Sequence, residues 1–240
     1  MKNLHAFPSF ARFLLAVSML ASLDALAAPS EITAQYQLAH KTLGVVGRVD
    51  ENYSRNGDKY SIRSVSRSEG ALKVFLDDQI VLESSGKVNA QGLQPLTFGQ
   101  HRVNSTKGQV RATFHWDKGI MVSAHGGDLS EVPLPRATQD RISLMYQFMN
   151  LSLGEATVTM PMSNGRKVDV YTYRLVDEVR VTTPAGDFDT RHYTRVTTGP
   201  KESKADVWLA KSHFNFPVRI VFDDAKGLRL EQTLVALEAR

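Results

Sequence analysis

The stretch RATFHWDKGIMVSA, residues 111–124, predicts the fold of this chain most directly. Apolar and polar residues alternate on both sides of Asp117–Gly119, which is typical of two half-buried strands joined by a tight turn. A three-residue loop with its glycine in the left-handed conformation would pair three apolar residues with three others: Trp116 with Ile120, Phe114 with Val122 and Ala112 with Ala124. The stretch therefore predicts an antiparallel sheet with one face buried and one face in water.

Turn signals recur along the rest of the chain at short intervals. Asn56-Gly57 favours a two-residue turn that would pair Tyr53 with Tyr60. Three further turns are expected, at Asn164-Gly165, at Pro184–Gly186 and at Asp223–Gly227, where Phe222 would pair with Leu228. Together these hairpins predict a meander of about ten antiparallel strands.

Residues 138–151 form a pattern of a different kind. Ile142, Met145, Tyr146 and Met149 recur at helical spacing, and further apolar residues fill the opposite side. Thr138 or Asp140 can cap the start, and Gly154 follows the end. A helix that is apolar on most sides must be covered on most sides. We therefore expect a mainly β fold, an open half-barrel curved around one or two helices; residues 71–76 fit a short helix or a strand equally well.

The first 27 residues resemble a bacterial export signal. Lys2 and Arg12 precede the short apolar run Phe13–Leu23, and Ala25-Leu26-Ala27 matches an A-x-A cleavage site. The run is too short to span a bilayer, which takes about 20 residues. We expect cleavage near Ala27, which leaves residues 28–240 as a single β-rich periplasmic domain.

Composition narrows the function classes. The chain has no cysteine, so thiol catalysis, disulfides and thiolate metal sites are excluded. The formal net charge of +4 is too small to indicate nucleic-acid binding, although it is compatible with anionic lipid. No second apolar run approaches the length of a membrane span.

Catalytic and cofactor motifs are missing from the sequence. It contains no nucleophile elbow, no phosphate-binding glycine loop and no histidine pair at metal-ligand spacing, so no catalytic residue, metal or cofactor is predicted. Asp187 and Asp189 share a strand face, but beside a predicted turn they fit a solvated hairpin end better. A pair of distant carboxylates for glycoside hydrolysis stays open, because sequence spacing does not reveal it.

A series of fragments resembles a known family. The series consists of GLQP with Thr97-Phe98, then Phe114-His115-Trp116, then QDRISLMYQ at residues 139–147, and finally VWLA followed by Phe216–Ile220. In this order the fragments resemble the family of exported bacterial proteins known as domain of unknown function 3108, over roughly Tyr36 to Leu237. The resemblance implies no reaction and no catalytic residue. It also implies a fold similar to the lipoprotein-carrier group of half-barrels, LolA and LolB among them, in which a curved sheet holds an acyl chain or a peptide.

Two function classes follow, with a third as an outlier. The first is a non-enzymatic periplasmic protein that binds or carries a lipid, lipoprotein or glycolipid in an apolar cleft. The second is an envelope interaction module with a filled core and a protein partner, and the third is an enzyme acting on polysaccharide. The candidate cleft residues are Phe114, Trp116, Val122, Met145, Met149 and Trp208. They are large and apolar, so their alternative role is ordinary core packing. An apolar groove of at least about 300 Å³ would favour the first class, and a filled interior the second.

Overall fold

β-Strands make up most of the computed structural model, which describes residues 28–70, 73, 79–151, 154–199 and 202–240. Within these described residues fifteen strands form one open sheet, and this confirms the mainly β prediction. The expected count of about ten strands was too low. One reason is the turn between the fourth and fifth strands, whose two central residues, Ala90 and Gln91, are not typical turn residues; its signals are the flanking Asn89 and Gly92, and the Asn89 side chain accepts the N–H of Gln91 at 2.8 Å.

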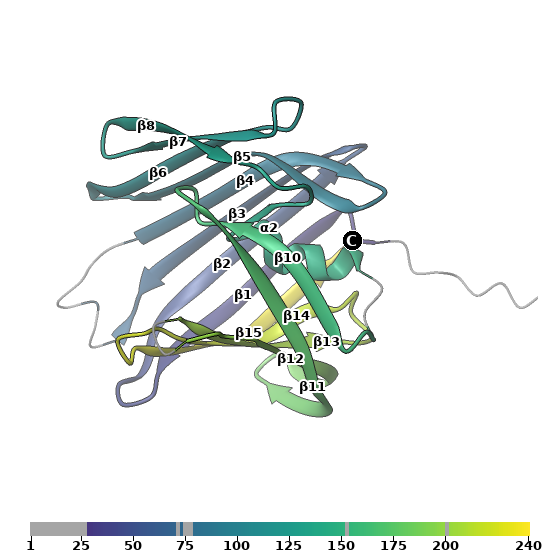
Figure 1. Ribbon diagram of the computed structural model, residues 1–240. Coiled ribbons are helices and arrows are strands. Elements are labelled where there is room, and N and C mark those ends of the chain that lie inside the picture. Colours follow the sequence, from purple (N-terminus) through teal and green to yellow (C-terminus); the bar gives the residue numbers. More distant parts are fainter. Residues whose placement is uncertain (1–27, 71–72, 74–78, 152–153, 200–201) are drawn as a thin grey trace, which may run out of the picture.

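Two meanders build the sheet (Figure 1). Strands β1 to β8 follow one another towards one edge, and β10 to β15 return in order from the other edge, so that β15 pairs with β1. The strands of the first meander are β1 (Glu31–His40), β2 (Gly44–Asn56), β3 (Lys59–Ser68), β4 (Gln79–Asn89), β5 (Gly92–Arg102), β6 (Ser105–His115), β7 (Ile120–His125) and β8 (Asp128–Pro133). The remaining strands are β9 (Gln139–Asp140), β10 (Thr157–Ser163), β11 (Val168–Thr183), β12 (Gly186–Arg195), β13 (Lys204–Ala210), β14 (Phe216–Asp223) and β15 (Arg229–Ala239).

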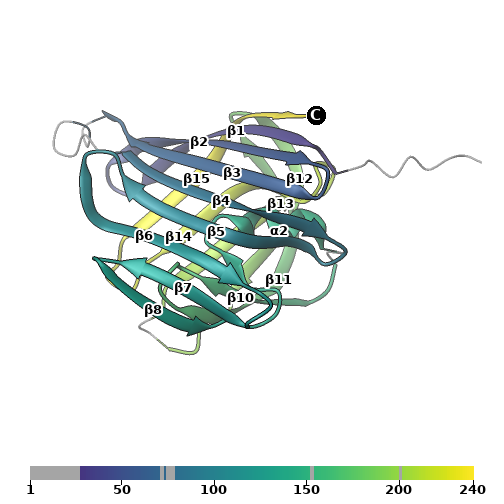
Figure 2. The same ribbon diagram turned by 90° about the horizontal axis from the view of Figure 1, so that it is seen from above.

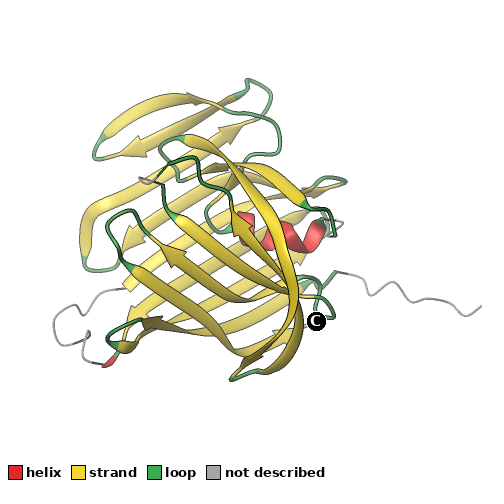
Figure 3. Cartoon of the chain, turned by 60° about the horizontal axis from the view of Figure 1, so that its bottom comes forward, coloured by secondary structure: helices red, strands yellow, loops and turns green. Residues whose placement is uncertain are grey.

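A short helical segment lies inside the curve of the sheet (Figures 2 and 3). It consists of α2 (Ser143–Gln147) and the 3₁₀ turn η1 (Phe148–Asn150), so it is shorter than the helix predicted over residues 138–151. The first residues of that range are extended instead, because Gln139 and Asp140 form β9 and pair in parallel with β10. Neither described helix is long and apolar enough to cross a membrane. Most of residues 71–76 lies outside the described residues, as do residues 1–27.

Two apolar clusters fill most of the concave side. The first, below α2, has large side chains that are at most 2% exposed: Tyr36, Phe98, Met121, Tyr146, Phe216 and Leu234. The second joins α2 and η1 to the second meander, through Leu144, Phe148, Met160, Met162, Tyr173, Tyr193, Val207 and Leu209. The centre of the half-barrel is therefore packed with side chains.

The two limbs of the sheet meet across this concave side. The Ser123 hydroxyl on β7 donates a hydrogen bond to the carbonyl of Gly165, in the turn between β10 and β11, at 2.6 Å. A Cβ atom at Gly165 would lie only 2.5 Å from a methyl carbon of Val110, and the residue has a φ of 85°. Only glycine meets both conditions, so the turn lies flat against the opposite limb.

The hairpin of residues 111–124 has a different register from the predicted one. Phe114 lies opposite Met121 and Thr113 opposite Val122, because the turn holds four residues, Trp116–Gly119, instead of three. A shift of one residue moves every side chain of the second strand to the other face. Val122 therefore does not share the face of Phe114, as the three-residue loop would require.

Two other predicted registers were wrong by two residues. The turn at Asn56-Gly57 uses Gly57 and Asp58, so Tyr53 pairs with Ile62. At the last hairpin Phe222 pairs with Leu230 rather than Leu228. A two-residue shift keeps each side chain on its face, so the buried faces are unaffected. The hairpins at Asn164-Gly165 and Pro184–Gly186 are confirmed.

Two glutamine side chains fix the helical segment to β5. The Gln147 side-chain oxygen accepts the N–H of Leu93 at 2.8 Å, and its amide donates to the Gln91 carbonyl at 2.7 Å. The Gln139 amide donates to the Leu93 carbonyl at 2.8 Å. These bonds satisfy backbone groups that the helix would otherwise bury without partners, and they hold α2 at a fixed position over the sheet.

Candidate functional site

A pocket of about 310 Å³ lies on the concave side, between the start of α2 and the second meander. Each strand from β10 to β14 contributes at least one side chain to the lining of the pocket. The turn residue Asn164 also contributes one. The lining consists of Arg141, Leu144, Met145, Met162, Asn164, Tyr171, Tyr173, Arg195, Ser203, Ala205 and Phe222. We call this site the Met145 pocket. Its volume lies at the lower end of the range for small-molecule sites, about 300–1,000 Å³.

The floor of the Met145 pocket is apolar. Leu144 and Met162 are 2% and 7% exposed and belong to the second cluster, and Met145 packs against both clusters. Phe222 is 38% exposed, so the apolar lining extends to the surface. Methionine side chains adapt to ligands of varied shape, which suits an alkyl chain.

Two arginines line the same pocket. Arg195 donates from Nη1 to the Ser203 carbonyl at 3.1 Å, and its guanidinium carbon lies 3.5 Å from the centre of the Tyr171 ring. Arg141 donates from Nη1 to Gln100 Oε1 at 2.9 Å. Arginine keeps its charge even when it is buried. The pocket thus combines an apolar floor with two positive charges, of which Arg195 is held by its contacts with Ser203 and Tyr171 and Arg141 is exposed.

The other predicted cleft residues do not gather at this pocket. Phe114 lies in the first cluster and stacks on Trp116 at 6.2 Å, and Met149 packs against the same cluster. The Trp208 ring stacks on His192 at 4.2 Å and faces Arg219, whose guanidinium carbon lies 4.7 Å from the ring centre. Of the six residues, only Met145 lines the Met145 pocket.

Trp116 borders a second hollow, of about 420 Å³, at one end of β4 and β5. Its indole N–H donates to the Pro95 carbonyl at 2.7 Å, which fixes the ring. Apart from Trp116, Leu93 and Ala137, the lining is polar: Asn89, Gln91, Gln94 and Arg136. Three apolar residues line this hollow, whereas the Met145 pocket is lined by Leu144, Met145, Met162, Ala205 and Phe222.

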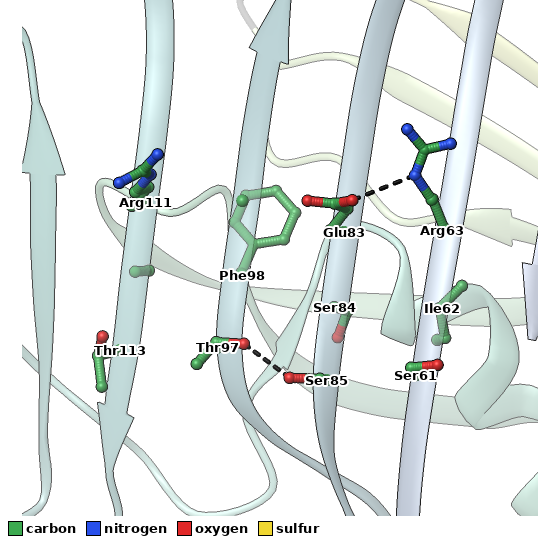
Figure 4. A pocket seen from close by; sticks show the side chains of 12 residues that line it. Ser61, Ile62, Arg63, Glu83, Ser84, Ser85, Thr97, Phe98, Arg111 and Thr113 are labelled. Carbon is green, nitrogen blue, oxygen red and sulfur yellow. Dashed lines mark hydrogen bonds and ion pairs between the residues drawn. The ribbon is translucent and has the colours of Figure 1, made fainter. Parts of the chain in front are cut away.

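The outer face of β3 to β6 carries a third hollow, of about 510 Å³ (Figure 4). Its rim is polar: Arg63 and Glu83 form an ion pair at 3.2 Å, and the hydroxyls of Ser85 and Thr97 lie 2.8 Å apart. Gly99 leaves the space open because it has no side chain. The hollow lies between polar side chains on one sheet face, and its lining also includes Ile62, Phe98 and Ala112, which are each 2% exposed.

Met145 was one of the candidate residues predicted from the sequence, whereas the two arginines that line the same pocket were not. Arg195 stands near the end of a strand with mixed polar residues, and nothing in its neighbours marks it as inward-facing. Arg141 had one signal, since it lies within QDRISLMYQ, a fragment of the family resemblance that also contains Met145.

Two carboxylates lie against the core outside the Met145 pocket; among the described residues Asp140 is fully buried and Glu51 is half-buried. Glu51 accepts hydrogen bonds from Ser64 at 3.0 Å and from the Tyr146 hydroxyl at 3.1 Å, and burial raises its pKa. Asp140 accepts from the Ser84 hydroxyl at 2.5 Å and from the N–H of Ser143 at 2.8 Å. Burial raises the pKa of Asp140 to about 6, against the lowering effect of those hydrogen bonds. Both groups therefore favour the protonated form more than exposed carboxyls do.

The raised pKa of Asp140 predicts a pH-dependent stability. Between pH 4 and 6 the folded chain holds a proton that the unfolded chain has released, so the free energy of unfolding falls as the pH rises through this window. A pKa rise from 3.8 to about 6 corresponds to roughly 3 kcal/mol. Urea unfolding at pH 4.5, 5.5 and 7 measures this change in the free energy of unfolding.

The matched control for that experiment is Asp140→Asn. An asparagine oxygen still accepts the backbone N–H groups, and its amide can donate to Ser84, yet the group does not titrate. The parent should lose stability relative to this variant from pH 4.5 to 7. Parallel curves for the two proteins would show that Asp140 has an ordinary pKa.

Comparison with known proteins identifies the family and the fold. The family model described as "protein of unknown function (DUF3108)" matches residues 35–233. A crystal structure of a β-barrel-like protein of domain of unknown function DUF1849 from Brucella abortus superposes with a TM-score of 0.60 at 13% identity, over 89% of this chain and 99% of that one. At that identity the likeness shows the fold alone.

Two further solved structures are more distant. An exported protein with a YmcC-like fold from Bacteroides fragilis has a TM-score of 0.34 and 12% identity, over 88% of this chain and 96% of that one. A protein described as a lipoprotein from Parabacteroides distasonis has a TM-score of 0.39 and 9% identity, with the same coverage of the two chains. No curated protein matches the sequence. The family match spans most of the sheet and includes α2 and the residues from Arg141 to Phe222 that line the Met145 pocket, and on this match the chain belongs to the DUF3108 family.

Proposed function

We propose that this protein binds a long-chain amphiphile in the Met145 pocket, as a non-enzymatic binding or carrier protein of the bacterial envelope. The observation that carries the proposal is a pocket of about 310 Å³ whose apolar floor reaches the surface at Phe222. Side chains fill the centre of the half-barrel, and the Met145 pocket is an apolar space that stays open beside α2. An alkyl chain that enters beside Phe222 would contact Met145 and Met162.

The free energy of binding that apolar burial can supply limits which ligands could bind in the pocket. Each buried methylene contributes about 0.8 kcal/mol, so about eight of them contribute about 6 kcal/mol. Association costs at least about 4 kcal/mol. Apolar burial alone would therefore give binding weaker than millimolar, and a polar head group must supply the rest. Charge-assisted hydrogen bonds of about 1.5–3 kcal/mol each would bring the dissociation constant to the micromolar range.

Export to the envelope is part of the proposal, and it rests on residues 1–27. The purified envelope form should begin at Ala28 or Pro29, because cleavage is expected after the A-x-A site. N-terminal sequencing of the protein from a periplasmic extract measures this. Recovery of the chain with Met1 intact in a membrane fraction would contradict it.

An envelope interaction module is the second candidate. β8 is an edge strand of the sheet, and the exposed fraction of its Leu129 is 75%. An edge of this kind can accept a strand from a partner. The same strand carries Asp128, Glu131 and Pro133, residue types that protect edges against pairing. Leu129→Lys should abolish capture of a protein partner under this second function and leave amphiphile binding intact.

A further inference from the structure

We infer that the ligand of the Met145 pocket carries an anionic oxygen head group, a carboxylate or a phosphate, which Arg195 and Arg141 hold. The inference rests on the proposed function and names its ligand class. Both head groups share the chemistry that matters here, namely several acceptor oxygens with a negative charge. Guanidinium groups bind such oxygens with paired hydrogen bonds.

Arg195 supplies the main observation. Its side chain is only 11% exposed, and its Nε atom is buried without a hydrogen-bond partner among the described residues. The ion pair with Glu202 is long, with 3.8 Å between Nη2 and Oε2. A buried charged donor without an acceptor is costly, and native structures rarely keep one without a reason. The Nε atom itself has almost no accessible surface, so an anionic oxygen in the pocket would bind at the Nη end of the guanidinium, where Nη2 lies 3.8 Å from Glu202.

The charge balance of the pocket points the same way. Arg141 and Arg195 both line it, and no acidic residue belongs to the described part of the lining. Arg141 has one printed acceptor, the neutral amide oxygen of Gln100. Two positive charges in one apolar pocket repel each other weakly when it is empty, and an anion removes that repulsion.

The apolar floor and the two arginines line the same pocket, so a single ligand molecule could contact both. Tyr171 fixes Arg195 by stacking, and the Ser203 carbonyl fixes its Nη1 end, so the guanidinium does not need to be ordered when a ligand binds. Met145 and Met162 line the apolar part of the same pocket. A single-chain amphiphile would place its tail on these methionines and its head at the guanidinium groups.

Calorimetric titration of the purified full chain with four dodecyl compounds tests the inference. Dodecanoate and dodecyl phosphate carry the two anionic heads, dodecanol is neutral, and dodecyltrimethylammonium is cationic, all used below their micelle-forming concentrations. We expect the better of the two anions to bind at least tenfold more tightly than dodecanol, and the cation to bind most weakly. Whichever anion binds more tightly identifies the head group.

Arg195→Gln is the diagnostic variant, and Arg174→Gln is its matched control. The glutamine removes the charge and keeps the stem of the side chain with a polar end, whereas Arg174 is exposed on β11 and does not line the pocket. Affinity for the anion should fall at least tenfold in Arg195→Gln and change less than twofold in Arg174→Gln. Thermal melts of both variants show that they fold.

The outcomes separate the two claims. Equal affinity for anion and dodecanol, or an unchanged anion affinity in Arg195→Gln, would overturn the head-group inference while the pocket still binds alkyl chains. Tightest binding of the cation would also overturn it. Absence of binding by all four compounds would overturn the proposed function itself.

Discussion

Replacing Tyr146 by alanine should lower the free energy of unfolding by about 4 kcal/mol or more, the largest stability effect we expect from one substitution. Tyr146 is 1% exposed at the centre of the first cluster. Its ring stacks on Tyr53 at 5.3 Å and meets Phe216 edge-on at 5.8 Å. Truncation leaves a cavity between α2 and the sheet, because the strands around it are fixed by their own hydrogen bonds. Urea unfolding measures the loss.

The Tyr146 hydroxyl adds a polar component to that loss. It donates to Glu51 at 3.1 Å, and the carboxyl is buried. Tyr146→Phe keeps the ring and removes this donor, so it should cost about 1–3 kcal/mol by leaving an acceptor short of a partner. Tyr146→Phe therefore serves as the control that separates packing from hydrogen bonding. An alanine variant within about 1 kcal/mol of the parent would show that α2 is not packed as described.

Met145→Trp should weaken amphiphile binding at least tenfold, the largest effect we expect on function. The indole is much larger than the methionine side chain, and the pocket of about 310 Å³ has little room to spare. A bulkier residue in a packed site costs about 1–3 kcal/mol of stability. The variant should therefore stay folded while its pocket is blocked. Titration with dodecanoate measures the affinity.

The chain offers two matched controls for this experiment. Met149 lies one turn further along, in η1, and packs against the first cluster without lining the pocket. Met149→Trp should carry a similar packing cost and leave affinity unchanged. Met145→Leu conserves volume and should bind like the parent. Equal loss of affinity in the Met145 and Met149 tryptophan variants would mean that general repacking, not blockage, weakens binding.

Local sequence signals were enough for the fold class and for several turns. Asn164-Gly165 and Pro184–Gly186 join the strands that they were expected to join, because these residues favour turns whatever surrounds them. Alternation of apolar and polar residues indicated a sheet with one buried face. The apolar pattern of residues 142–149 correctly indicated a helical segment packed inside the sheet, although β9 takes the first residues of the predicted range.

Contacts between distant residues decided the parts that sequence did not predict. Trp116 was expected in a strand, but its indole bonds to the Pro95 carbonyl and the residue becomes part of the turn. This shift by one residue moved Val122 to the other face. Arg195 lies opposite Tyr173 only through the pairing of β11 and β12, and a register bulge precedes that contact. No local pattern encodes such a position, so the charged part of the pocket was missed.

The most direct test of the account is a titration of the purified, delipidated protein with a fluorescent long-chain fatty acid. The account predicts saturable binding of one molecule per chain, with a dissociation constant in the micromolar range and competition by dodecanoate. It also predicts that Met145→Trp removes this binding. A signal that does not saturate, or that is the same in the parent and in Met145→Trp, would contradict the claim that the Met145 pocket binds an amphiphile.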